Sequence, residues 1–352
     1  MGLSKQLLLA PIITILVGFC VVVAYGETND AANTTNAPDI KALMEGISNG
    51  KDAFTTTNVL MLLERANSGD AEAQFRLGLC YLLGKGVAQD SAEAVKWHRK
   101  AADQEYTKAQ YCLGSSYYFG IGVPQDYKEA VIWYRKAAER GDADAQCSLG
   151  FCYCHGNGVA QDYTNAVYWC RKAAEQGNAK SQRLLGSFYD YGKGVSQDYT
   201  NAIYWYRKSA EQGCANAQFN LGLCYCNGKG VSQDYTNAVM WYRKAAEQGD
   251  AKAQRNLGSA YHYGAGVSKD QVEAVQWYRK SAEQGDAEAR FNLGTCYYNG
   301  NGVQKDFTNA VNWFRKSAQQ GYAPAQDLLK KMSSPPSNSP TNAITDVLQP
   351  PR

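Results

Sequence analysis

The densest group of side chains that could bind a metal is the run Cys152-Tyr153-Cys154-His155. Thiolates and imidazoles are ligands that zinc prefers, and a closed zinc site needs four of them converging on the ion. On a helix, residues two apart point about 200° away from each other. Cys152 and Cys154 therefore cannot hold one ion, and we expect no metal and no cofactor.

Two other motifs suggest catalysis only at first sight. Ser48-Asn49-Gly50-Lys51 matches the Ser-x-x-Lys of penicillin-binding enzymes, but no Ser-Asp-Asn or Lys-Thr-Gly accompanies it. Segments such as Gly84-Lys85-Gly86 lack the preceding strand and the following Lys-Ser/Thr of a phosphate-binding loop, so they predict turns. We therefore expect a protein that is not an enzyme.

The cysteines predict buried thiols rather than a set of disulfides. A series at a spacing of 72 residues comprises Cys80, Cys152, Cys224 and Cys296. Members of this series lie two repeats apart, and packed helix axes are already about 8–10 Å apart, whereas a bridge needs Cα atoms within about 7 Å. Cys147 and Cys154 are separated by two helical turns, about 10 Å. Only the pair Cys112 and Cys147 stays open.

Composition excludes further classes. Lys and Arg number 36 and Asp and Glu 33, a net charge of +3, without the clustered basic excess that nucleic-acid binding requires. Hydrophobic residues make up 45% of the chain, enough to build a core. We expect no nucleic-acid partner.

The N-terminal residues predict export. Lys5 precedes the apolar segment Leu7–Ala24, and Ala24 and Gly26 place small residues around a cleavage site. We expect a signal peptide at 1–26 and a periplasmic or secreted protein, or one in the lumen of the endoplasmic reticulum if the source is eukaryotic. An uncleaved membrane anchor stays open, because the apolar segment is just long enough to span a bilayer.

The middle of the chain is one 36-residue unit written seven times. The tryptophans mark it: Trp97, Trp133, Trp169, Trp205, Trp241, Trp277 and Trp313. In each repeat the apolar residues predict two helices; Gly84 ends the first, and Asp90 caps the second, with Glu93 placed for a capping box. A fixed period of this length is typical of a solenoid, so we predict an all-α fold of stacked helix-turn-helix repeats.

The remaining boundaries follow from the repeats. Residues 27–39 predict a disordered linker, 40–68 a degenerate N-terminal capping repeat, and 69–320 the seven repeats. Residues 321–332 predict a C-terminal capping helix, and 333–352 a disordered Pro/Ser-rich tail.

The pattern Ala-x-x-x-Leu-Gly-x-x-Tyr, Gly-x-Gly-Val, Asp-x-x-x-Ala-x-x-Trp resembles the Sel-1-like repeat family, relatives of the tetratricopeptide repeats. The resemblance implies a right-handed superhelix that acts as a scaffold or adaptor for proteins or peptides. One branch, the Helicobacter-type cysteine-rich proteins, has a disulfide in each repeat between cysteines eight residues apart. Here Ala102, Ala138 and Ala174 occupy the corresponding helix end.

In tetratricopeptide-like geometry the first helices line the concave surface. Positions beside Leu77 and Tyr81 differ between repeats although packing demands are alike, and they carry aromatic residues and Arg, which are common at interfaces. The predicted protein- or peptide-binding residues are Tyr111, Tyr118, Phe151, Arg183, Asp190, Tyr191, Phe219, Arg255, His262, Tyr263 and Tyr298. The alternative for the aromatic rings is packing against the preceding repeat.

Two other functions stay open at this point. One is a cell-wall hydrolase or β-lactamase-like activity, as proposed for some exported relatives of the family. The other is a structural scaffold that holds partners by its convex face. The sequence indicates neither the ligand nor the oligomeric state.

Overall fold

The structure is a computed structural model that describes residues 56–333. These residues form sixteen helices and no strand, which confirms the predicted all-α class. The predicted signal peptide, the linker and the tail beyond Ser333 lie outside the described residues. None of the helices between residues 56 and 333 is both long and apolar enough to cross a membrane.

Two kinds of helix alternate along the chain. The first helices of the seven repeats are α4 (Ala71–Leu83), α6 (Thr107–Phe119), α8 (Ala143–His155), α10 (Ala179–Tyr191), α12 (Ala215–Asn227), α14 (Ala251–Tyr263) and α16 (Ala287–Asn299). The second helices are α5 (Ser91–Asp103), α7 (Tyr127–Glu139), α9 (Tyr163–Glu175), α11 (Tyr199–Glu211), α13 (Tyr235–Glu247), α15 (Gln271–Glu283) and α17 (Phe307–Gln319). Helix α3 (Thr56–Asn67) precedes them, and α18 (Ala323–Ser333) follows them.

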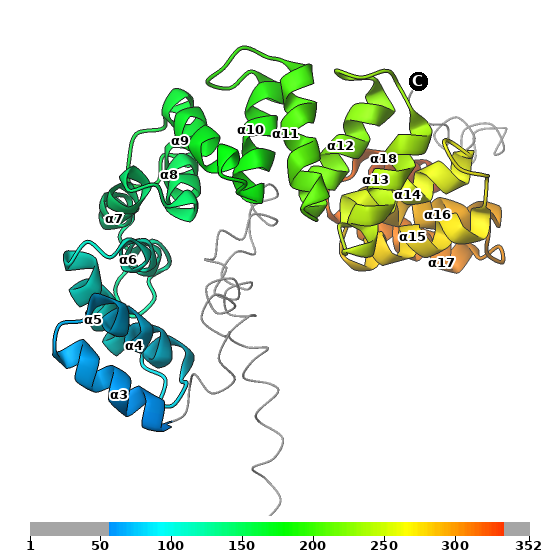
Figure 1. The fold of residues 1–352 in the computed structure, drawn as a ribbon. Coiled ribbons are helices and arrows are strands. Elements are labelled where there is room, and N and C mark those ends of the chain that lie inside the picture. The colour runs from blue at the N-terminus through cyan, green and yellow to red at the C-terminus, as the bar shows by residue number, and fades with distance from the viewer. Residues whose placement is uncertain (1–55, 334–352) are drawn as a thin grey trace, which may run out of the picture. The chain divides into compact units, whose positions relative to one another are not determined.

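The helices form two compact units, which divide between Ser181 and Gln182 inside α10. In the first unit each helix from α3 to α9 packs against the next, and in the second unit α11 to α18 do the same (Figure 1). Helix pairs therefore stack within each unit, as a solenoid requires.

The helix ends are set by the predicted cap residues, but the expected capping box is only half formed. Asp90 Oδ1 accepts hydrogen bonds from the backbone N–H groups of Ala92 and Glu93, at 2.9 and 3.0 Å. In the next repeat the glutamate does not complete the box: Glu129 accepts from the Trp133 indole N–H at 3.0 Å. The N–H of the cap residue Asp126 donates instead to the Tyr117 carbonyl. Glu129 and Glu273 thus accept from the tryptophan four residues on, whereas Glu93 pairs with Lys96 at 2.7 Å.

Glycines at two positions in each repeat permit close approach. Gly114, inside α6, faces Tyr134 of α7, where a Cβ would lie 2.7 Å from the ring. Gly122, the second glycine of the Gly-x-Gly turn, has φ +72°, and a Cβ there would lie 2.1 Å from the Ser91 carbonyl oxygen. Gly120, the first glycine of that turn, ends α6, and Gly122 lets the turn rest on the preceding repeat.

Buried glutamines join successive layers, a feature that the apolar pattern does not reveal. The Gln146 amide donates to the Ala138 carbonyl at the end of the preceding second helix at 3.0 Å. Its oxygen accepts from Gln176 at 2.8 Å. The same amide-to-amide bond joins Gln74 to Gln104, Gln182 to Gln212, Gln218 to Gln248, and Gln254 to Gln284.

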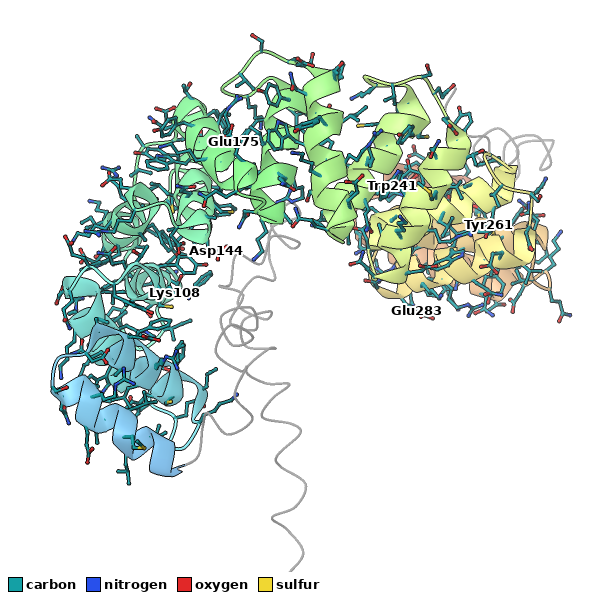
Figure 2. All side chains as sticks on the ribbon, in the orientation of Figure 1. Lys108, Asp144, Glu175, Trp241, Tyr261 and Glu283 are labelled. Carbon is teal, nitrogen blue, oxygen red and sulfur yellow. The ribbon has the colours of Figure 1, made fainter. Side chains whose placement is uncertain are left out.

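The repeated Arg-Lys pair of the second helices also serves the stack. Arg243 donates to the Tyr261 hydroxyl of the next repeat at 2.6 Å, and Lys244 Nζ lies 4.3 Å from the Trp241 ring centroid; Figure 2 labels Trp241 and Tyr261. Similar arginine–tyrosine bonds occur at Arg135, Arg207 and Arg279. These arginine and lysine side chains therefore contact the repeats as well as solvent.

Candidate functional site

The recurring leucines and the rings beside them build the core. The leucine of each first helix is 0% exposed: Leu77, Leu113, Leu149, Leu185, Leu221, Leu257 and Leu293. The ring beside it on the second helix, such as Tyr134 or Tyr206, is buried as well. A ligand can reach only the positions outside this set.

Two predicted contact residues belong to the core. Tyr111 and Tyr118 are 6% and 5% exposed, which corrects the expectation that they face a groove. The Tyr118 ring packs edge-on against Tyr127 at 4.9 Å, and its hydroxyl accepts a hydrogen bond from the Asn157 amide at 2.7 Å. The reason is that space remains between the second and third repeats, and a ring at this position fills it.

Three further predicted rings are half-buried and pack on neighbours. Phe151 stacks on His155 with ring centroids 3.9 Å apart. Phe219 lies 6.0 Å from Tyr242. Tyr298 meets the edge of Phe307 at 5.2 Å. Each of these ring contacts lies within the residue's own repeat, whereas the packing alternative expected contact with the preceding repeat.

Two of the predicted charged residues, Arg255 and Asp190, form ion pairs. Arg255 Nη1 lies 3.1 Å from Asp286 and 2.9 Å from Glu288, both of the following repeat. Asp190 lies 3.8 Å from Lys229 Nζ and accepts from the Tyr206 hydroxyl at 3.4 Å. These contacts fix the side chains in place. Arg183 is half-buried.

Two predicted residues stand out from the surface. Tyr191 and Tyr263 are 66% and 57% exposed, each the last residue of a first helix. His262, beside Tyr263, is half-buried, and desolvation lowers the pKa of its imidazole. Tyr191 and Tyr263 are therefore the predicted residues best placed to touch a partner.

A cavity of about 240 Å³ opens beside Tyr263, between the fifth and sixth repeats. Its walls come from α12, α13, α14 and the turn after α14. They consist of Leu223, Cys226, Tyr235, Ala238, Val239, Tyr242, Asn256, Ser259, Ala260, Tyr263 and Ala265. The lining is mostly apolar and contains no charged side chain, so it suits an apolar group.

Most of the residues that line the cavity were not predicted from the sequence. Of the eleven predicted residues only Tyr263 lines it. The other walls combine core residues such as Ala238 and Val239 with partly exposed ones such as Tyr235, and the space arises because small side chains from two repeats coincide. The signal was present in the comparison of repeats: Cys226 and Ala265 are smaller than Tyr118 and Lys229, their counterparts in other repeats.

The described residues offer little reactive chemistry. No group of three or more His, Cys, Asp or Glu side chains in residues 56–333 is arranged to hold a metal ion. The ten cysteines of this segment, Cys112 and Cys147 among them, are thiols rather than disulfides. Burial raises the pKa of Cys112 and of Cys152 to about 12, which leaves both poor nucleophiles.

Comparison with known proteins identifies the repeats. The Sel1 repeat matches seven consecutive segments: 71–106, 107–142, 143–178, 179–214, 215–250, 251–286 and 287–322. A comparison with curated proteins gave no match.

The solved structures similar to this chain include two proteins with this repeat. A protective antigen of uropathogenic Escherichia coli strains, which displays an SLR fold, is 40% identical with a TM-score of 0.73 over 82% of this chain; the match spans 63% of that protein. A Sel1 repeat protein from Oxalobacter formigenes is 32% identical with a TM-score of 0.65, over 90% of this chain and 93% of that one.

Proposed function

Because the chain belongs to the Sel1 repeat family, we propose that it is an exported scaffold that binds a protein or peptide through the surface of its first helices. Sel1 repeats typically mediate protein–protein interactions. Export rests on the N-terminal sequence, with Lys5 before an apolar segment and small residues around Gly26.

The observation that carries this proposal is the division between constant and variable positions. Packing residues recur in every repeat and are buried, whereas the most exposed predicted rings, Tyr191 and Tyr263, occupy a first-helix position that differs between repeats. Tyrosine supplies much contact area at a small entropic cost and is enriched in interfaces. A surface of this kind favours binding over catalysis.

The test is affinity capture from a periplasmic or secreted fraction, with exposed residues changed so that folding is unaffected. Tyr191→Ser and Tyr263→Ser should each reduce capture about tenfold, the effect of losing one interface ring. Tyr204→Ser is the matched control, because Tyr204 is also exposed but lies on a second helix. Loss of capture with Tyr204→Ser alone would refute binding through the first helices.

A hydrolase is the competing function. Its test is turnover of a β-lactam such as nitrocefin by the purified protein. Turnover that survives Tyr191→Ser and Tyr263→Ser, with no partner captured, would replace the scaffold proposal.

A further inference from the structure

In three of the seven repeats, a site at the end of the first helix holds an aromatic ring. In the second repeat Tyr118 occupies it, with its ring centroid 4.9 Å from Tyr127 and 6.2 Å from Tyr134. Tyr127 and Tyr134 belong to the second helix, and Tyr118 reaches them from the end of the first. We call this position the ring site.

Other repeats also fill the ring site with their own ring. In the sixth repeat His262 takes the position of Tyr118 and lies 6.4 Å from Tyr278. In the seventh repeat Tyr298 takes it and lies 5.2 Å from Phe307. A ring therefore occupies the ring site in the second, sixth and seventh repeats.

The fourth repeat uses a cation instead. Asp190 stands where Tyr118 stands in the second repeat, so no ring is available. Lys229 reaches over from the turn of the fifth repeat, with its Nζ 5.3 Å from the Tyr199 ring centroid and 3.8 Å from Asp190. A lysine above an aromatic ring replaces the missing contact.

The fifth repeat has neither an aromatic ring nor a lysine at this site. Cys226 stands at the position of Tyr118, and Ala265 at the position of Lys229. The supporting rings are nevertheless present, since Tyr235 and Tyr242 correspond to Tyr127 and Tyr134. The ring site is therefore built but unfilled, and it is the 240 Å³ cavity.

The hydrogen bonding at this site is also incomplete. Tyr134 and Tyr278 donate from their hydroxyls to Ser115 and Ser259, at 3.2 and 3.1 Å. Leu223 takes the serine position beside Tyr242 and cannot accept, so the buried Tyr242 hydroxyl lacks the serine bond that Tyr134 and Tyr278 make and faces only the side chains of Asn256 and Cys226. Both observations distinguish the fifth repeat from its neighbours.

We propose that a partner protein inserts one aromatic side chain of tyrosine or phenylalanine size into this cavity, between Tyr235 and Tyr242. The inference rests on the proposed scaffold function and names the contact. An apolar cavity of about 150 Å³ already binds benzene, whereas pockets for whole small-molecule ligands usually measure about 300–1,000 Å³. The size of this one fits a single side chain, and Tyr263 at its edge continues it into the exposed surface of the first helices.

The first experiment uses p-cresol, the side chain of tyrosine, as the probe. Cys226 lines the cavity and is a half-buried free thiol, so its alkylation by iodoacetamide should slow when the ring is bound. At ten times the dissociation constant we expect the rate to fall about tenfold. Cys214, a half-buried free thiol outside the cavity, should react at an unchanged rate. Equal protection of both thiols, or none at about 10 mM p-cresol, would overturn the proposal.

The second experiment fills the site from within. Cys226→Tyr recreates the second-repeat arrangement and should abolish p-cresol binding, measured by ligand-observed NMR, while raising the melting temperature. Asn227→Tyr is the matched control, since Asn227 is exposed and outside the cavity. If Cys226→Tyr does not fold, Ala265→Lys blocks the site from the turn, as Lys229 does. A folded blocking variant that binds p-cresol like the wild type would refute the site.

Affinity capture then separates this inference from the scaffold function. Capture by wild type and Asn227→Tyr but not by Cys226→Tyr or Ala265→Lys supports insertion into the cavity. Capture of the same partner by all four proteins would leave the scaffold function standing and overturn the inserted side chain. Capture by none would contradict the scaffold function itself, and the inserted side chain with it, even if p-cresol binds.

Discussion

Arg140→Gln should stabilise the protein, because it repairs the one glutamine pair that the described repeats leave incomplete in the first unit. Gln110 is buried and donates to the Ala102 carbonyl, but its own oxygen has no hydrogen-bond partner. In the next repeat the equivalent oxygen, on Gln146, accepts from Gln176. Arg140 stands at the position of Gln176 and turns away to pair with Glu105.

The magnitude follows from two opposing contributions. A buried acceptor without a partner costs about 1–3 kcal/mol. The Arg140–Glu105 pair that would be lost is exposed, with 41% and 69% of the side chains accessible, and such pairs contribute about 0–1 kcal/mol. The net expectation is a gain of about 1 kcal/mol, or a rise of about 2–4 °C in the melting temperature for a chain of this size.

Thermal unfolding followed by circular dichroism measures this shift. Gln176→Arg is the matched reverse change, since it should leave the Gln146 oxygen unpartnered and lower the melting temperature by a similar amount. A rise in one variant and a fall in the other supports the reasoning. Shifts of the same sign, or no shift in either, would show that the amide pair does not stabilise the stack.

Three further predictions concern stability. Burial lowers the pKa of His98 from its ordinary value of 6.5 to about 4, so protonation favours the unfolded chain and stability falls as the pH drops from 6.5 towards 4. The loss from pH 7 to pH 5 should be about 2 kcal/mol, and His98→Phe, tested by melts at both pH values, should remove it. Gly122→Ala should lower the free energy of unfolding by about 3 kcal/mol in denaturant titration, because it adds a backbone clash to a left-handed φ. Gly177→Ala is the control and should lower it by only about 1–2 kcal/mol, because no atom lies within 4 Å of the added Cβ. Glu105 has φ 65° where other repeats have glycine, so Glu105→Gly should raise stability by about 1 kcal/mol in the same assay; a loss would contradict the argument from backbone conformation.

The fold could be predicted because packing imposes the same demand on every repeat. The leucine and tryptophan series return every 36 residues, and helix caps such as Asp90 and Gly84 mark where each helix begins and ends. The exact first and last residues of each repeat were harder to predict. The predicted array spans 69–320, whereas the family match spans 71–322, since Gly69 and Asp70 form the turn and cap before α4.

Polar contacts between layers could be predicted less well. The role of Gln146 depends on which carbonyl and which amide of the neighbouring helices face it. The helical periodicity of the sequence does not indicate these partners. Glu129 illustrates the same limit: its spacing from Asp126 predicts a capping box, but the Trp133 indole four residues on competes for the carboxylate and wins. Where two donors within one helical turn can reach the same carboxylate, packing determines which of them bonds to it.

The candidate site shows why variation between repeats is an ambiguous signal. Tyr118 varies and yet is buried, because Asn157 of the next repeat supplies the donor that its hydroxyl needs. Asp190 varies, and Lys229 compensates for it. A change in one repeat is thus often balanced by a change in the next, and the residue at a single position does not show whether it faces a ligand or a neighbour.

Paired comparison resolves this ambiguity, because the repeats share one backbone and act as controls for one another. Where a residue of the next repeat supplies the contact that a substitution removes, packing between the repeats is kept and the substitution does not indicate binding. Cys226 is not balanced: Ala265 supplies neither a ring nor a cation, while Tyr235 and Tyr242 keep the arrangement that holds a ring elsewhere. Leaving such a cavity empty costs stability, so its persistence in an otherwise regular array favours an occupant that comes from outside the chain.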